Sequence, residues 1–128
     1  METKKYKLTE ETIIVNDKSL YRIKALKDFG NVKKGDKGGF VENESNLSQS
    51  DNCWVYGNAK VYDNAKVCDN AMVNNNAKVH DNAEVYCYAW VYDDAVVCGN
   101  AVLSNIAKVH GKATVCGNRE VCGNTEVC

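Results

Sequence analysis

His80 and His110 are the residues of this sequence best suited to acid–base chemistry. An imidazole gains and loses a proton near neutral pH, so a histidine held beside a substrate can act as a general base. A catalytic histidine also needs a carboxylate or amide that orients its ring, and the sequence identifies no such partner for either one. We keep both as candidates for a base, expect them to occupy ordinary outward positions, and assign no catalytic residue.

Seven cysteines are the other reactive side chains. The first residues of the chain include lysines but no apolar run of the kind found in a secretion signal. We therefore expect a cytoplasmic protein whose cysteines are reduced thiols rather than a framework of disulfides.

Length and composition indicate one domain, because the chain has 128 residues of which 45% are hydrophobic. The formal net charge is -1, which gives no signal for binding the phosphates of a nucleic acid. No segment approaches the roughly 18 consecutive apolar residues of a membrane span. We therefore expect neither a nucleic acid nor a membrane as a partner.

From Val55 to the last residue, the sequence repeats in units of six residues such as VYGNAK and VYDNAK. Each unit begins with valine, except for Leu103, and most units place alanine four residues later. Between them lie Gly, Asp and Asn, the residue types that tolerate a left-handed backbone at corners. A period of six excludes an amphipathic helix, whose period is 3.6 residues. Each unit is therefore predicted to be a short strand followed by a corner.

Three units make one triangular turn of 18 residues, and successive turns stack through parallel strand pairing. The sequence thus predicts an all-β fold, a left-handed parallel β-helix of about four turns, over residues 47–128. Residues 1–46 lack the repeat and contain short strand patterns on both sides of the turn Asn16-Asp17-Lys18. We expect them to form a β-hairpin cap that covers one end of the solenoid.

The repeat resembles the hexapeptide-repeat, left-handed parallel β-helix superfamily over residues 49–128. The form VYGNAKVYDNAKV, preceded by GGFVENESNLSQSDNCWVY, is similar to uncharacterised bacterial and bacteriophage hexapeptide proteins, some of which carry a transferase label. The resemblance implies three functional classes: acyltransferases, γ-class carbonic anhydrases, and proteins without known chemistry.

Two enzymatic interpretations follow from this resemblance. An acyltransferase would bind coenzyme A between subunits and use His80 or His110 as its base, with acetyl-CoA as the cofactor; the uninterrupted repeat speaks against it. A carbonic anhydrase needs three histidines around one zinc ion, and the sequence has two. Cys116, Cys122 and Cys128 are six residues apart and should point in three directions, so we expect no metal site.

Assigning outward positions by the 18-residue turn places large apolar side chains on one face. This predicted contact face contains Trp54, Tyr56, Met72, Trp90 and Tyr92, and it extends to Tyr88, His110, Val127 and Cys128. Aromatic and methionine side chains in such a patch are typical of surfaces that other protein covers. The cover is a homo-oligomer (dimer or trimer), a different protein, or the N-terminal cap, and the sequence leaves these three open.

The sequence therefore favours a non-catalytic protein that acts through protein–protein contacts and uses no cofactor. The resemblance to bacteriophage proteins implies an inhibitor of a host protein, such as a defence component, in the host cytosol. The coenzyme-A-dependent acyltransferase remains the alternative.

Overall fold

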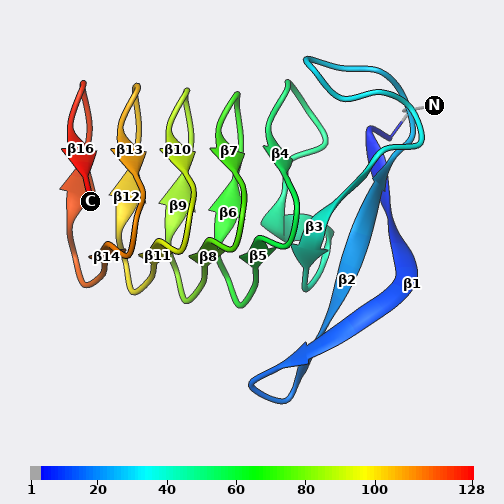
Figure 1. The fold of residues 1–128 in the computed structure, drawn as a ribbon, viewed down its shortest axis with the longest axis horizontal. Coiled ribbons are helices and arrows are strands. Elements are labelled where there is room, and N and C mark those ends of the chain that lie inside the picture. Colours follow the sequence, from blue (N-terminus) through cyan, green and yellow to red (C-terminus); the bar gives the residue numbers. More distant parts are fainter. Residues whose placement is uncertain (1–3) are drawn as a thin grey trace.

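The computed structural model describes residues 4–128, which form a parallel β-solenoid of about five turns with a β-hairpin at its N-terminal end (Figure 1). Strands of two residues make up the solenoid. They are β4 (Trp54–Val55), β5 (Lys60–Val61), β6 (Lys66–Val67), β7 (Met72–Val73), β8 (Lys78–Val79), β9 (Glu84–Val85), β10 (Trp90–Val91), β11 (Val96–Val97), β12 (Val102–Leu103), β13 (Lys108–Val109), β14 (Thr114–Val115), β15 (Glu120–Val121) and β16 (Glu126–Val127).

The corners between these strands form for the reason that the sequence indicates. Asp63, Asp69, Asp81 and Asp93 lie at corners with φ angles of 59°, 59°, 61° and 60°, and glycine takes the same conformation elsewhere. Aspartate tolerates this left-handed region better than most residues. The predicted role of these aspartates as corner residues is confirmed.

The three faces of the solenoid are parallel sheets with the orders β16-β13-β10-β7-β4, β15-β12-β9-β6 and β5-β8-β11-β14. Residues one turn apart are paired, as Met72 is with both Trp54 and Trp90. This register confirms the 18-residue turn.

The core is a column of inward valines and alanines along the solenoid axis. Val73, Val85 and Val97 are fully buried, as are Ala77 and the other alanines of the central turns. Because only one residue of each two-residue strand points inward, the core is narrow and each turn buries its apolar side chains chiefly against its neighbours. Cys53 occupies an inward position and is fully buried.

The N-terminal hairpin consists of β1 (Tyr6–Val15) and β2 (Lys18–Ala25), joined by a tight turn in which Asn16 and Asp17 have φ angles of 51° and 67°. Strand β3 (Lys37–Val41) then pairs antiparallel with β2 and parallel with β5, so it links the hairpin to the solenoid. A short 3-10 turn, η1 (Glu44–Asn46), follows, and the Asn46 amide donates to the carbonyl of Ala65 at 2.9 Å. The cap therefore continues one sheet of the solenoid.

Trp54 is buried rather than exposed, with 1% of its surface accessible. Tyr6 and Phe29 of the N-terminal segment cover it edge-on, with ring centroids 6.0 Å and 5.1 Å away. The placement of Trp54 in an exposed contact face is wrong. At this turn the cap provides the cover, which is one of the three alternatives that the sequence leaves open. The non-repeating segment could not be placed against Trp54 from the period of the sequence.

Within residues 4–128, no helix is long and apolar enough to cross a membrane.

Candidate functional site

The exposed part of the predicted contact face lies on the sheet β16-β13-β10-β7-β4. Met72 and Trp90 are paired on β7 and β10, and the rings of Trp90 and Tyr92 are in contact with centroids 4.7 Å apart. The Trp90 indole N–H donates to Asn74 Oδ1 at 3.3 Å, which fixes the orientation of the ring. These side chains are half-buried, so part of each remains accessible to a binding partner.

Tyr88 and Ile106 are much more exposed, at 64% and 50%. They lie on neighbouring corners, two residues before the start of β10 and β13, and the backbone N–H of Tyr88 donates to the carbonyl of Asn105 at 2.8 Å. Together they line a shallow hollow of about 530 Å³ with Cys87 and Asn124 among its other walls. We call the surface formed by Met72, Trp90, Tyr92, Tyr88 and Ile106 the aromatic face.

Ile106 is the member of this face that the sequence analysis missed. It occupies the second corner position of the unit LSNIAK, where most units have asparagine. The isoleucine at this position was the available signal. The unit VYCYAW departs from the repeat in the same way, with Cys87 and Tyr88 at its corner positions.

The other residues of the predicted contact face lie around this surface. Tyr56 and Val127 are half-buried and pack against the core, whereas Cys128 is exposed after β16. His110 is half-buried after β13, and its ring stacks on that of Tyr92 with centroids 4.8 Å apart and an interplanar angle of 6°.

Carboxylates orient both histidines, although the sequence did not reveal them. His110 Nε2 is 2.8 Å from Glu126 Oε2, and its Nδ1 is 3.9 Å from Asp93 Oδ2. These partners lie one turn away along the solenoid, which is why no local motif identifies them. An oriented imidazole is one component of a general-base site.

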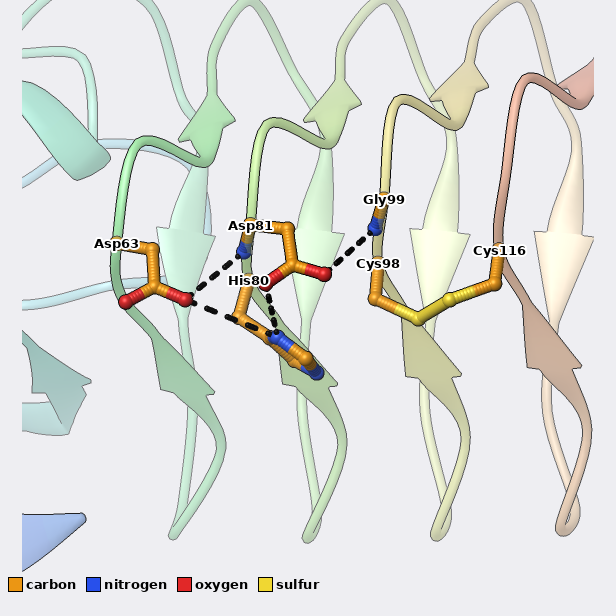
Figure 2. The surroundings of a disulfide bond; sticks show 6 residues. All are labelled: Asp63, His80, Asp81, Cys98, Gly99 and Cys116. Atoms are coloured by element: carbon orange, nitrogen blue, oxygen red, sulfur yellow. Dashed lines mark hydrogen bonds and ion pairs between the residues drawn. A yellow bond between two sulfur atoms is a disulfide. The ribbon is translucent and has the colours of Figure 1, made fainter. Parts of the chain in front are cut away.

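His80 lies on a different face, after β8, and has a similar environment (Figure 2). Its ring stacks on Tyr62 with centroids 5.0 Å apart, and its Nδ1 is 3.1 Å from Asp81 Oδ1 and 3.8 Å from Asp63 Oδ2. Two hydrogen bonds lower the pKa of Asp81: the one from the Gly99 backbone N–H has the larger effect, and the one from His80 has the smaller effect. His80 and His110 therefore lie on different faces of the solenoid.

Asp63, His80 and Asp81 are also the residues that could hold a metal ion. One donor atom from each lies within 4.8 Å of the others, and two carboxylates with an imidazole suit a divalent transition metal. Lys18 Nζ, 3.3 Å from Asp63 Oδ1, already places a positive charge at this cluster. The absence of a metal site stays a prediction.

The groove beside this cluster is polar and has a volume of about 530 Å³. Among the residues that the structure describes, its charged walls are Glu42, Asp63 and Asp81, with Lys18 as the single cation. An excess of carboxylates repels the phosphates of coenzyme A, so this groove gives the acyltransferase interpretation no support.

Cys98 and Cys116 form a disulfide between β11 and β14, with their Cα atoms 4.6 Å apart (Figure 2). The expectation that all cysteines are reduced thiols is therefore wrong for this pair. The two residues lie one turn apart on the same face, which brings them to the spacing that a disulfide needs. Cys122 and Cys128 are free and follow strands of the two other sheets, as the six-residue spacing predicts.

Lys5 is a buried cation that the sequence analysis did not single out, with 1% of its surface accessible. Its ammonium donates to the carbonyl of Cys53 at 2.8 Å and lies 3.4 Å from Cys53 Sγ. Burial lowers the pKa of Lys5 and raises that of the Cys53 thiol. Lys5 thus fixes the N-terminal segment to the first corner of the solenoid.

Comparison of the chain with protein-family models and with curated proteins finds no match.

Proposed function

We propose that this protein is a non-catalytic scaffold that acts through protein–protein contacts made by the aromatic face. The observation that carries the proposal is the exposure of Tyr88 and Ile106 on neighbouring corners beside the partly exposed Trp90. Isolated apolar side chains at a surface are ordinary, but two exposed ones on neighbouring corners, with Trp90 two residues after Tyr88, favour an interface.

The chemistry around the face indicates what kind of surface it binds. The corner residues beside Tyr88 and Ile106 are the uncharged Asn105 and Asn124. Lys108 and Glu126, which have opposite charges, are paired on β13 and β16. A face without a dominant charge fits an apolar protein surface with polar edges better than a nucleic acid.

The rigidity of the solenoid supports the same proposal. Tyr88 and Ile106 sit on corners whose backbones are hydrogen-bonded to the next turn, including Ile106 N–H to the carbonyl of Gly123 at 3.1 Å. Side chains held on an ordered backbone lose less conformational entropy on binding than side chains of a flexible loop.

The partner is a protein of the host cell if the resemblance to bacteriophage hexapeptide proteins extends to function. In that case the scaffold works in the host cytosol as an inhibitor of a host protein, such as a defence component. Self-association into a dimer or trimer through the same face is the alternative use of the surface.

The test compares the wild type with a Tyr88→Ser, Ile106→Ser double variant, and Ile14→Ser is the matched control. Ile14 is 67% exposed on β1, so the control removes a similar apolar side chain from another surface. Light scattering measures self-association, and affinity capture followed by mass spectrometry measures binding to a host protein. All variants should keep the circular dichroism spectrum of the wild type, because the altered side chains point into solvent.

The expected result is that the double variant loses whichever contact the wild type makes, while Ile14→Ser keeps it. A wild type that is monomeric and captures no protein would contradict the proposal. So would a contact that survives in the double variant, because that contact would use another surface.

The oriented histidines favour a second candidate, the coenzyme-A-dependent acyltransferase. His110 Nε2 at 2.8 Å from Glu126 Oε2 has the arrangement that a general base needs, and acetyl-CoA would bind at a subunit boundary. Calorimetric titration with acetyl-CoA, together with an assay of acetyl transfer, tests this function. Support for it over the first would be a His110→Gln variant that binds acetyl-CoA as the wild type does but has lost acetyl transfer.

A further inference from the structure

We propose that Cys98 and Cys116 form a thiol-exchange site, at which small thiols such as glutathione attack the Cys116 sulfur and open the disulfide reversibly. The proposal concerns a reaction of this pair and holds whether or not the aromatic face binds a protein.

The backbone hydrogen bonds around the pair also occur where there is no disulfide. Val97 and Val115, which precede the two cysteines, are paired in parallel, and the Cys98 N–H donates to the carbonyl of Val115 at 2.9 Å. The previous turn has the same hydrogen bond, from His80 N–H to the carbonyl of Val97 at 3.0 Å, and no disulfide. Opening the bond therefore leaves both thiols in place, one turn apart, where they can close again.

The two sulfurs differ in their access to solvent. Cys98 is 6% exposed, whereas Cys116 is an exposed residue. Thiol–disulfide exchange requires the attacking thiolate to approach one sulfur in line with the bond, so access decides which sulfur is attacked. An incoming thiol reaches Cys116, and Cys98 is the leaving group.

The exchange balances in two steps. A small thiolate forms a bond to Cys116 Sγ, the bond between Cys116 and Cys98 breaks, and the electron pair leaves on Cys98, which takes a proton from water. Cys98 then either attacks the mixed disulfide and expels the small thiol, or stays reduced while a second small thiol releases Cys116. In the second case two small thiols become a small disulfide, and Cys98 and Cys116 become two thiols. An oxidised small disulfide drives the reverse reaction.

The position of the pair gives the exchange a structural consequence. Residues between Cys98 and Cys116 make up one complete turn, with a sequence separation of 18, and this turn includes Ile106. In the oxidised state a covalent bond closes that turn, and in the reduced state hydrogen bonds and packing alone hold it.

The experiment treats the folded wild type with reduced glutathione, stops the reaction with acid, and maps adducts by peptide mass spectrometry. We expect the disulfide to open without loss of the circular dichroism spectrum and a transient glutathione adduct on Cys116. In Cys98→Ser, which lacks the thiol that expels glutathione, treatment with oxidised glutathione should leave a lasting adduct on Cys116. In Cys116→Ser, the buried Cys98 should remain unmodified.

Cys122→Ser is the matched control, because Cys122 is exposed and its neighbour one turn earlier is Ser104. Its exchange at Cys116 should match that of the wild type. The proposal would be overturned by a disulfide that opens only in denaturant, by adducts on Cys98 in preference to Cys116, or by thiols that oxidised glutathione does not convert to the disulfide. Because the wild type alone gives these outcomes, they remain decisive even if a variant fails to fold.

Discussion

Individual side chains in this protein obtain their partners from the neighbouring turn, and the corner aspartates show how. Asp81 Oδ2 accepts a hydrogen bond from the Gly99 N–H at 3.0 Å, and Asp93 Oδ2 accepts one from the Gly111 N–H at 3.1 Å. An aspartate at a corner therefore does two things: it adopts the left-handed backbone, and it binds the next corner. The aspartates next to His80 and His110 are corner residues of this kind, so the orientation of the histidines is a consequence of how the corners stack.

Removing the buried ammonium of Lys5 should destabilise the protein even when methionine supplies an apolar side chain in place of the lysine stem. In Lys5→Met, the carbonyls of Ser50, Asp51 and Cys53 lose the donor that now serves them. Leaving buried acceptors without a donor costs about 1–3 kcal/mol in the free energy of unfolding. Urea denaturation followed by circular dichroism measures this loss.

Lys4→Met is the matched control for that measurement. Lys4 is exposed, and its ammonium is 3.1 Å from Glu44 Oε2 in a surface ion pair. Such pairs contribute about 0–1 kcal/mol, so the control should unfold at nearly the wild-type urea concentration. Equal losses in the two variants would show that the Lys5 ammonium has no special role.

At the scale of the element, the two-residue strand and its corner form a unit that the sequence specifies almost completely. Valine points inward, the residue before it points outward, and the corner residue takes a positive φ angle. The sequence therefore predicted the turns, their register and the buried columns. It left the cover of Trp54 open among three alternatives, because residues outside the repeat have no period that places them. Nor did it predict the carboxylate partners of the histidines. Asp63, Asp93 and Glu126 lie in other units of the repeat, and Asp81, which follows His80 directly, was interpreted only as a corner residue.

Two glycines of one corner column allow a test of how tightly the turns stack. Gly99 and Gly117 have φ angles of 63° and 76°, so alanine at either position carries the left-handed penalty of roughly 1–2 kcal/mol. A Cβ at Gly99 would also lie 2.6 Å from the Gly117 backbone nitrogen, whereas a Cβ at Gly117 would meet nothing within 4 Å. We expect Gly99→Ala to lower the melting temperature more than Gly117→Ala. Equal shifts would mean that the turns separate enough to admit a methyl group.

The whole molecule is quasi-one-dimensional, because its turns pack chiefly against their immediate neighbours along the axis. The narrow core of valine and alanine is continuous from the cap to β15, with Val121 at 3% exposure near its far end. Damage to one central turn should therefore affect the turns on both sides of it.

Val85→Asp places a charge in the middle of this core, where the valine is fully buried. Burying an unpaired carboxylate costs several kcal/mol, which is comparable with a total stability of about 5–15 kcal/mol. We expect the variant to be unfolded by circular dichroism and by one-dimensional proton NMR. Glu84→Val, one residue earlier and facing outward, should stay folded; a folded Val85→Asp would contradict the inward assignment of the valine column.

The burial of Trp54 by the cap has a consequence for how the chain finds its register. The units of the repeat are so alike that a strand displaced by six residues would still place valine and alanine in the core. Tyr6 and Phe29 lie outside the repeat and pack against Trp54. The positions one unit away from Trp54 hold Ser48 and Lys60, so a shift of six residues loses this aromatic contact. The cap thus sets the register of the whole solenoid. Once its aromatic residues fix the first turn, each later turn can stack in one register only. A solenoid that starts to wind in another register must unwind before its first turn can pack against the cap.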